Sequence, residues 1–146
     1  MTPTFFGRVQ SRLFLLLYIG VPWTLLVSAV LPGVPDGVST SDVYKVTFRA
    51  LAIVAVVGVV IWEPIYHGLQ QFRWEKDWPS LFALVLGVPE GALAYALLTD
   101  SMNSERPPFW TFFWHFAPLW ILVWAVAIGP VRVVLLRYRF RGGRFI

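Results

Sequence analysis

Three titratable residues, Glu63, Glu90 and His115, lie inside long apolar stretches of the sequence. Glu90 stands near the middle of its stretch, and an ionised carboxylate at the centre of a bilayer costs about 2.5–3.5 kcal/mol even on lenient insertion scales. We therefore expect Glu90 to be protonated or paired, and to face protein or water. It can serve as a proton or ion relay or as a polar contact with a partner subunit, or it can tie helices together through a hydrogen bond.

Histidine and a carboxylate form a pair that suits proton handling. At 1.5 Å per residue, Glu90 lies roughly 12 Å and His115 roughly 9 Å below the outer ends of their stretches, so the two side chains are expected to meet. Glu63 lies close to the inner end of its stretch, where Arg12 or Arg132 of a neighbouring stretch can neutralise it. The sequence thus predicts an ion pair at Glu63, near the membrane surface.

Motifs for other chemistry are missing from the sequence. The chain contains no cysteine, which excludes disulfides and thiolate metal sites. It has no Walker loop, dinucleotide-binding fingerprint, HExxH zinc motif or nucleophile elbow. Its two histidines, His67 and His115, lie towards opposite faces of the membrane and cannot ligate a haem at one depth. We expect a protein that is not an enzyme and that has no catalytic residue, metal or cofactor.

The elements that carry these residues are four apolar stretches, at residues 13–31, 47–66, 79–98 and 109–131. Each is close to the roughly 20 residues that a membrane-spanning helix needs. The chain is 58% hydrophobic and 14% charged, whereas a soluble domain carries about 25% charged residues. No connecting segment exceeds 15 residues, so there is no room for a soluble domain. The sequence predicts an all-α, four-helix transmembrane bundle that forms one domain over residues 1–146.

Basic residues set the expected orientation. With the N-terminus in the cytoplasm, nine basic residues fall on the inner side and two, Lys45 and Arg106, in the outer loops. Such a bias in short loops predicts that both termini are cytoplasmic. Arginine outnumbers lysine ten to two, a bias typical of GC-rich bacteria, so we expect a bacterial inner membrane. The C-terminal arginines are expected to contact anionic lipids or a partner, and no nucleic acid. They are Arg137, Arg139, Arg141 and Arg144.

Small residues form a stripe on the third stretch, where Ala83, Gly87 and Gly91 recur every four positions. This spacing lets another helix approach closely, either within the bundle or from a partner protein. Aromatic residues crowd the outer end of the fourth stretch, over residues 109–124. A flat aromatic face suits contact with lipid chains or with a partner helix.

Two segments carry a family resemblance: Phe72-Arg73-Trp74-Glu75-Lys76-Asp77-Trp78-Pro79 and Arg139-Phe140-Arg141-Gly142-Gly143-Arg144. They resemble the corresponding segments of small, uncharacterised four-helix membrane proteins of actinobacteria. The resemblance implies an inner-membrane protein that accompanies a larger machine, for which lipid importers of the mammalian-cell-entry (Mce) type are one candidate. It carries over no catalytic residue.

Together these observations favour a non-catalytic accessory subunit of a larger inner-membrane complex that handles envelope lipids. Its expected partners are membrane lipids and other integral membrane subunits. The alternative is a small oligomeric transporter or channel with Glu90 in its pathway. A membrane enzyme or a lipid-binding protein is the third possibility.

Overall fold

The computed structural model describes residues 4–72, 80–102, 107–135 and 144 of the chain. Over these residues it contains helices and no strand, which confirms the all-α prediction. The first span consists of α1 (Phe5–Leu15), the π-helix η1 (Leu16–Gly20) and α2 (Val21–Val27), and the second of α3 (Thr40–Val57), the π-helix η2 (Gly58–Trp62) and α4 (Glu63–Gln71). The third consists of α5 (Ser80–Val85) and α6 (Gly87–Ser101), and the fourth of α7 (Phe109–Ile128) and α8 (Pro130–Val134).

Four helical runs, Phe5–Val27, Thr40–Gln71, Ser80–Ser101 and Phe109–Val134, are long and apolar enough to cross a membrane. The predicted number of spans is therefore confirmed, but their ends differ from the apolar stretches. The first run begins at Phe5 because Thr4 caps it, its hydroxyl accepting a hydrogen bond from the Gly7 amide. The second begins at Thr40 because Ser39 caps it in the same way. A helix begins where a side chain accepts hydrogen bonds from its first amides, and apolar composition alone does not mark that position.

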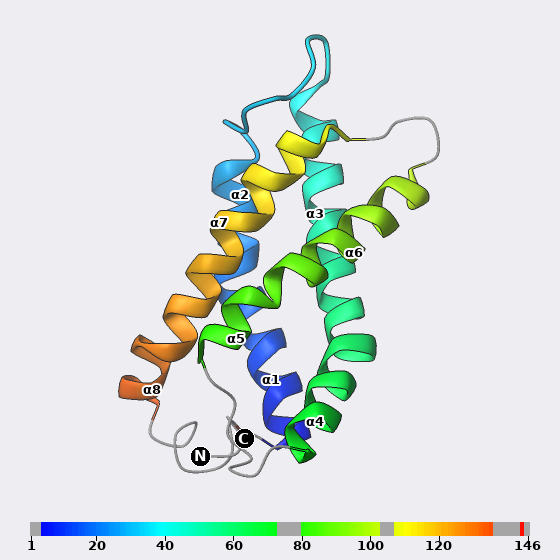
Figure 1. The fold of residues 1–146 in the computed structure, drawn as a ribbon. Helices are drawn as coiled ribbons and strands as arrows, with labels where there is room; N and C mark the ends of the chain where they lie inside the picture. The colour runs from blue at the N-terminus through cyan, green and yellow to red at the C-terminus, as the bar shows by residue number, and fades with distance from the viewer. Residues whose placement is uncertain (1–3, 73–79, 103–106, 136–143, 145–146) are drawn as a thin grey trace.

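The four spans run up and down, and each packs against the next. In Figure 1, α1 and α5 begin and α4 and α8 end at the lower end of the bundle, which we call the proximal end. The connection from α2 to α3 lies at the opposite, distal end (Figure 1). The second span packs on the first and third, and α7 packs on η1 and α6, so the spans close into a ring.

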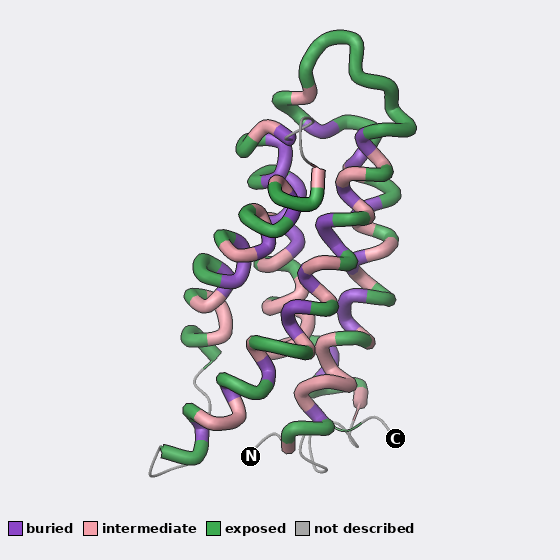
Figure 2. Tube along the Cα trace, turned by 90° about the vertical axis from the view of Figure 1, so that its right-hand side faces the viewer, coloured by how far each residue is buried: buried purple, intermediate pink, exposed green. Residues whose placement is uncertain are grey.

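The core lies in the middle of this ring. It is a cluster of nine buried residues: Leu16, Ala50, Leu51, Val54, Ala94, Leu98, Phe112, Phe116 and Leu119. Buried positions recur along the inward faces of the helices, and exposed ones cover the outside (Figure 2). Many exposed residues are large and apolar, such as Leu26 and Val88, which are 75% and 73% exposed. A surface of this kind suits lipid chains rather than water.

Two prolines shape the interior, and both follow a π-turn. Pro22 comes after η1 and Pro64 after η2, and each stands at the start of the next α-helix. A proline has no N–H for the helix ladder, and its ring clashes with the preceding turn. The wider turn closes instead with i→i+5 hydrogen bonds, from the Val21 amide to the Leu16 carbonyl and from the Glu63 amide to the Gly58 carbonyl. The second of these turns sets the position of Glu63.

Candidate functional site: a buried cluster of charged residues

Arg12 of α1 lies between the two intramembrane glutamates and contacts both. Its Nε donates to Glu63 Oε1 at 2.7 Å. Its Nη1 and Nη2 donate to Glu90 Oε2 at 2.7 Å and Glu90 Oε1 at 3.0 Å, a bidentate pair. Glu63 and Glu90 are only 5% and 3% exposed. A planar guanidinium with a rigid fork of donors suits this double role, because its Nε and its two Nη atoms can bond two carboxylates at once.

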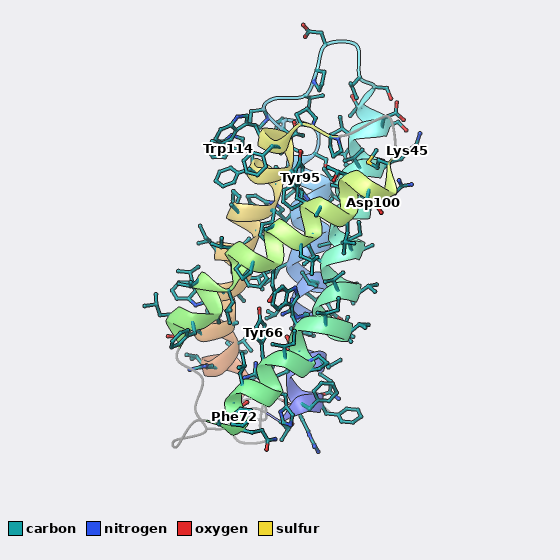
Figure 3. All side chains as sticks on the ribbon, turned by 45° about the vertical axis from the view of Figure 1, so that its right-hand side comes forward. Lys45, Tyr66, Phe72, Tyr95, Asp100 and Trp114 are labelled. Atoms are coloured by element: carbon teal, nitrogen blue, oxygen red, sulfur yellow. The ribbon has the colours of Figure 1, made fainter. Side chains whose placement is uncertain are left out.

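Three more polar side chains complete the cluster. The Tyr66 hydroxyl donates to Glu90 Oε1 at 2.7 Å, and Tyr66 points inwards in the lower half of the bundle (Figure 3). Arg8 Nη2 donates to Gln70 Oε1 at 3.0 Å, and Arg8 Nη1 lies 3.7 Å from Glu63 Oε2. Two arginines thus face two glutamates, and their charges balance. Buried charges are tolerated when they are paired and hydrogen-bonded in this way.

The backbone makes room for Arg12 at Gly58. A Cβ at Gly58 would lie 2.6 Å from both Cδ and Nη1 of Arg12, so only glycine leaves space for this side chain. In an α-helix, positions 58 and 63 would lie about 140° apart. The π-turn between them brings them nearer to one face. The Trp120 ring closes the other side, with its centroid 5.9 Å from the Arg12 guanidinium carbon.

The predicted pair between Glu90 and His115 is wrong. Glu90 is held by Arg12 and Tyr66, whereas His115 Nε2 lies 3.0 Å from the hydroxyl of Thr24. The physical reason is depth. The third span continues to Ser101, so Glu90 lies 11 residues, or roughly 16 Å, below its distal end, while His115 lies roughly 9 Å below the start of α7. Glu63 does form an ion pair, and of the two arginines that the sequence offered for it, Arg12 and Arg132, the partner is Arg12.

His115 belongs to a second polar group in the distal half of the bundle. The Thr24 hydroxyl donates to the Gly20 carbonyl, and Ser28 and Thr47 share a hydrogen bond of 2.7 Å. Leu16 and Leu51 separate this group from the charged cluster. Both are buried, and Leu51 Cδ1 lies 2.9 Å from the Cβ position of Gly20, one turn below Thr24. Along this part of the described interior, the two polar groups are divided by apolar side chains.

The small-residue stripe of the third span faces α7 of the same chain. A Cβ at Gly87 would lie 2.2 Å from Trp120 Nε1, and one at Gly91 would lie 2.6 Å from Phe116 Cε1. Ala83 is half-buried and lines a cavity between α1, α5 and α7. Gly87 and Gly91 therefore serve close packing inside the bundle, one of the two uses that the spacing allows.

One of the four predicted C-terminal contact residues, Arg144, lies within the described residues. Arg137, Arg139 and Arg141 lie outside the described residues. Arg144 is exposed, and its Nε donates to the Thr4 hydroxyl at 3.3 Å, next to the start of α1. Its proximity to the first helix agrees with the up-and-down arrangement.

Four participants in the charged cluster were not singled out from the sequence: Arg8, Gly58, Tyr66 and Gln70. Three of them carry a periodicity signal, including Gln70, which lies four residues after Tyr66 on α4. Arg8 lies four residues before Arg12, and Tyr66 lies three after Glu63, so each pair shares a helix face. Gly58 carries no such signal, because its role depends on the π-turn.

Among the described residues, no group of three or more histidine, aspartate or glutamate side chains is arranged to hold a metal ion. Comparisons of the chain with protein-family models, with curated proteins and with solved structures found no match.

Proposed function

We propose that the protein is a non-catalytic accessory subunit of a larger inner-membrane complex that handles envelope lipids. The observation that carries this proposal is the Arg12 guanidinium, which donates three hydrogen bonds to Glu63 and Glu90. Groups that relay protons or ions must exchange partners with water or substrate. Here both carboxylates are held by fixed partners from other helices, which is the arrangement of a structural lock.

The separation of the two polar groups argues against the alternative, a channel with Glu90 in its pathway. A relay across ~30 Å of hydrocarbon needs a continuous series of polar groups or water. Leu16 and Leu51 interrupt such a series between Arg12 and Thr24. The interior therefore favours a bundle that presents its outer surface to other molecules.

The face that we assign to partner contact is the aromatic ridge of α7, formed by Phe109, Trp110, Phe113 and Trp114. These side chains are 49%, 60%, 37% and 47% exposed, and neighbouring rings pack edge to face or tilted against one another. Trp114 projects from the bundle in its upper half (Figure 3). Rigid aromatic side chains of this kind give large contact areas at low entropic cost, as in the centres of protein interfaces.

In this proposal both termini lie in the cytoplasm, and the proximal end of the bundle lies at the inner leaflet. The excess of arginine in the inner segments supports this orientation. The link to envelope lipids rests on the resemblance to small actinobacterial membrane proteins. Other integral subunits and membrane lipids are the partners expected, and nucleic acid is not.

The test is purification of the tagged protein from its own membranes in mild detergent, followed by native mass spectrometry. The proposal expects one or more foreign membrane subunits at a fixed ratio to this chain. Replacing Phe113 and Trp114 by alanine should release them, since both belong to the ridge. Replacing Ile121 and Leu122 by alanine is the matched control, because these exposed residues lie lower on α7. Recovery of only homo-oligomers would contradict the proposal.

A further inference from the structure

A cavity of about 220 Å³ opens between α1, α5 and α7 in the proximal half of the bundle. Polar residues line part of it: Arg8, Ser11, Arg12, Glu63, Ser80 and Arg132. The rest of the lining is apolar and comes mainly from α7: Val123, Ala127, Ile128, and the indoles of Trp120 and Trp124. In Figure 1 the lower part of α1 and the α7–α8 end stand apart, with α5 between them in that view. The cavity therefore has a charged side and an apolar side.

The charge of the cavity is positive. Three arginines line it against one glutamate, and Glu90 behind Arg12 adds a second acid, which leaves one positive charge in excess. Arg132 of α8 supplies that excess: its side chain is exposed, and no described residue forms an ion pair with it. Arg132 lies two residues before the end of α8, at head-group level in a spanning bundle.

The apolar wall is held in place by hydrogen bonds to α5. Trp124 Nε1 donates to the Ser80 carbonyl at 2.7 Å, and Trp120 Nε1 donates to the Leu84 carbonyl at 3.1 Å. Both indole N–H groups are thus satisfied, and the rings contribute apolar surface. From Arg8 to Leu16, the lining follows the first span over eight residue steps, a rise of roughly 12 Å. This depth covers a lipid head group and the first part of its acyl chains.

We propose that this cavity binds the phosphate head group of an anionic phospholipid from the surrounding leaflet. Arg132, the lining arginine without an ion-pair partner among the described residues, contacts the phosphate, while Arg8 and Arg12, paired with glutamates, line the deeper part of the cavity. The first methylene groups lie against Trp124 and Ile128. A volume of about 220 Å³ holds a phosphate and its glycerol but no complete lipid, so the acyl chains continue along the exposed surface of the bundle. The inference needs no partner protein, since every lining residue belongs to this chain.

The experiment is native mass spectrometry of the purified chain, titrated in detergent with phosphatidylglycerol, with phosphatidylcholine or with inorganic phosphate. One phosphatidylglycerol should bind per chain, with an apparent Kd at least fivefold lower than that of phosphatidylcholine. Arg132→Gln should raise the Kd for phosphatidylglycerol about fivefold, the factor expected for one basic contact. Arg49→Gln is the matched control, because this exposed arginine lies near the distal end and outside the cavity lining, and it should change the Kd less than twofold.

A second pair of variants tests the cavity itself. Ala127→Phe places a ring in the cavity and should raise the Kd at least tenfold, whereas Ala125→Phe adds the same ring at an exposed position of the same helix and should have little effect. Equal Kd values for all four variants, or equal binding of phosphatidylcholine, would overturn the proposal. So would binding of inorganic phosphate with no retained lipid, because the site would then serve a free anion. None of these measurements depends on a partner, so their failure leaves the accessory-subunit proposal untouched.

Discussion

Removal of Arg12 is the most informative perturbation of the charged cluster. In Arg12→Met, Glu63 keeps Arg8 Nη1 at 3.7 Å as a counter-ion. Among the contacts described above, Glu90 keeps only the Tyr66 hydroxyl, at 2.7 Å. Glu90 is 3% exposed, so water cannot replace the lost guanidinium.

The expected loss follows from this geometry. Breaking a buried ion pair by removing one partner costs about 3–5 kcal/mol, because the remaining charge is left without compensation. That is a large part of the 5–15 kcal/mol that typically stabilises a folded protein. We therefore expect Arg12→Met to lower the free energy of unfolding by about 3–5 kcal/mol, with the bundle only marginally folded.

Equilibrium unfolding in mixed micelles of SDS and dodecyl maltoside, followed by tryptophan fluorescence, measures this loss. Arg49→Met is the matched control: it makes the same substitution at an exposed arginine, whose Nη1 forms a long hydrogen bond of 3.5 Å to the Ser101 carbonyl. Its effect should be within about 0.5 kcal/mol. The double variant Arg12→Met, Glu90→Met should recover much of the loss, because no unpaired charge remains. A single Arg12→Met as stable as Arg49→Met would refute the reasoning.

Three further predictions use the same unfolding assay or a labelling assay. Gly58→Ala should destabilise the bundle by about 1–3 kcal/mol, because the added Cβ would collide with the Arg12 side chain. Gly68→Ala is the control: the space around Gly68 is open, so the variant should stabilise the bundle by about 0.5–1 kcal/mol. Equal effects of the two variants would contradict the packing around Gly58. Glu90→Gln and His115→Ala should have additive effects on stability, since the two residues bind different partners; a coupling above about 0.5 kcal/mol would restore the pairing that we reject. A cysteine at Ser39, in a chain without native cysteine, should react with an impermeant thiol reagent added outside intact cells; protection from the reagent would reverse the proposed orientation.

The four spans could be predicted because a helix in contact with lipid needs apolar side chains along its length, and each span carries a long apolar run. Hydropathy does not mark their ends, because the caps at Thr4 and Ser39 lie several residues outside those runs; the cap at Ser39 is recognisable instead from the residue types of the segment Ser39–Asp42, and the cap at Thr4 was not predicted. A shift in the distal end of the third span was enough to misplace Glu90 relative to His115. When depth is counted from the proximal end instead, Arg12 lies roughly 10 Å and Glu90 roughly 15 Å from that end. This count favours Arg12 over His115 as the partner of Glu90.

The charged cluster was predictable in part. An ion pair of Glu63 with Arg12 or Arg132 followed from their common position near the inner ends of the spans, but the choice of Arg12 did not. The second bond of Arg12, to Glu90, did not follow, because it depends on space that the sequence does not reveal. That space comes from Gly58 and from the π-turn of η2, which brings positions 58 and 63 nearer to one face. Periodicity arguments assume 3.6 residues per turn, and they fail where a wider turn intervenes.

Ion flux into liposomes tests most directly the central claim, that the intramembrane charges hold the bundle together and carry nothing across it. The purified chain is reconstituted, a potassium gradient with valinomycin sets the membrane potential, and an internal pH dye reports proton entry. The account predicts entry at the rate of protein-free liposomes, for the parent chain and for Glu90→Gln alike. Entry above that background with the parent chain, lost in a Glu90→Gln variant that remains folded, would contradict it and make Glu90 part of a pathway.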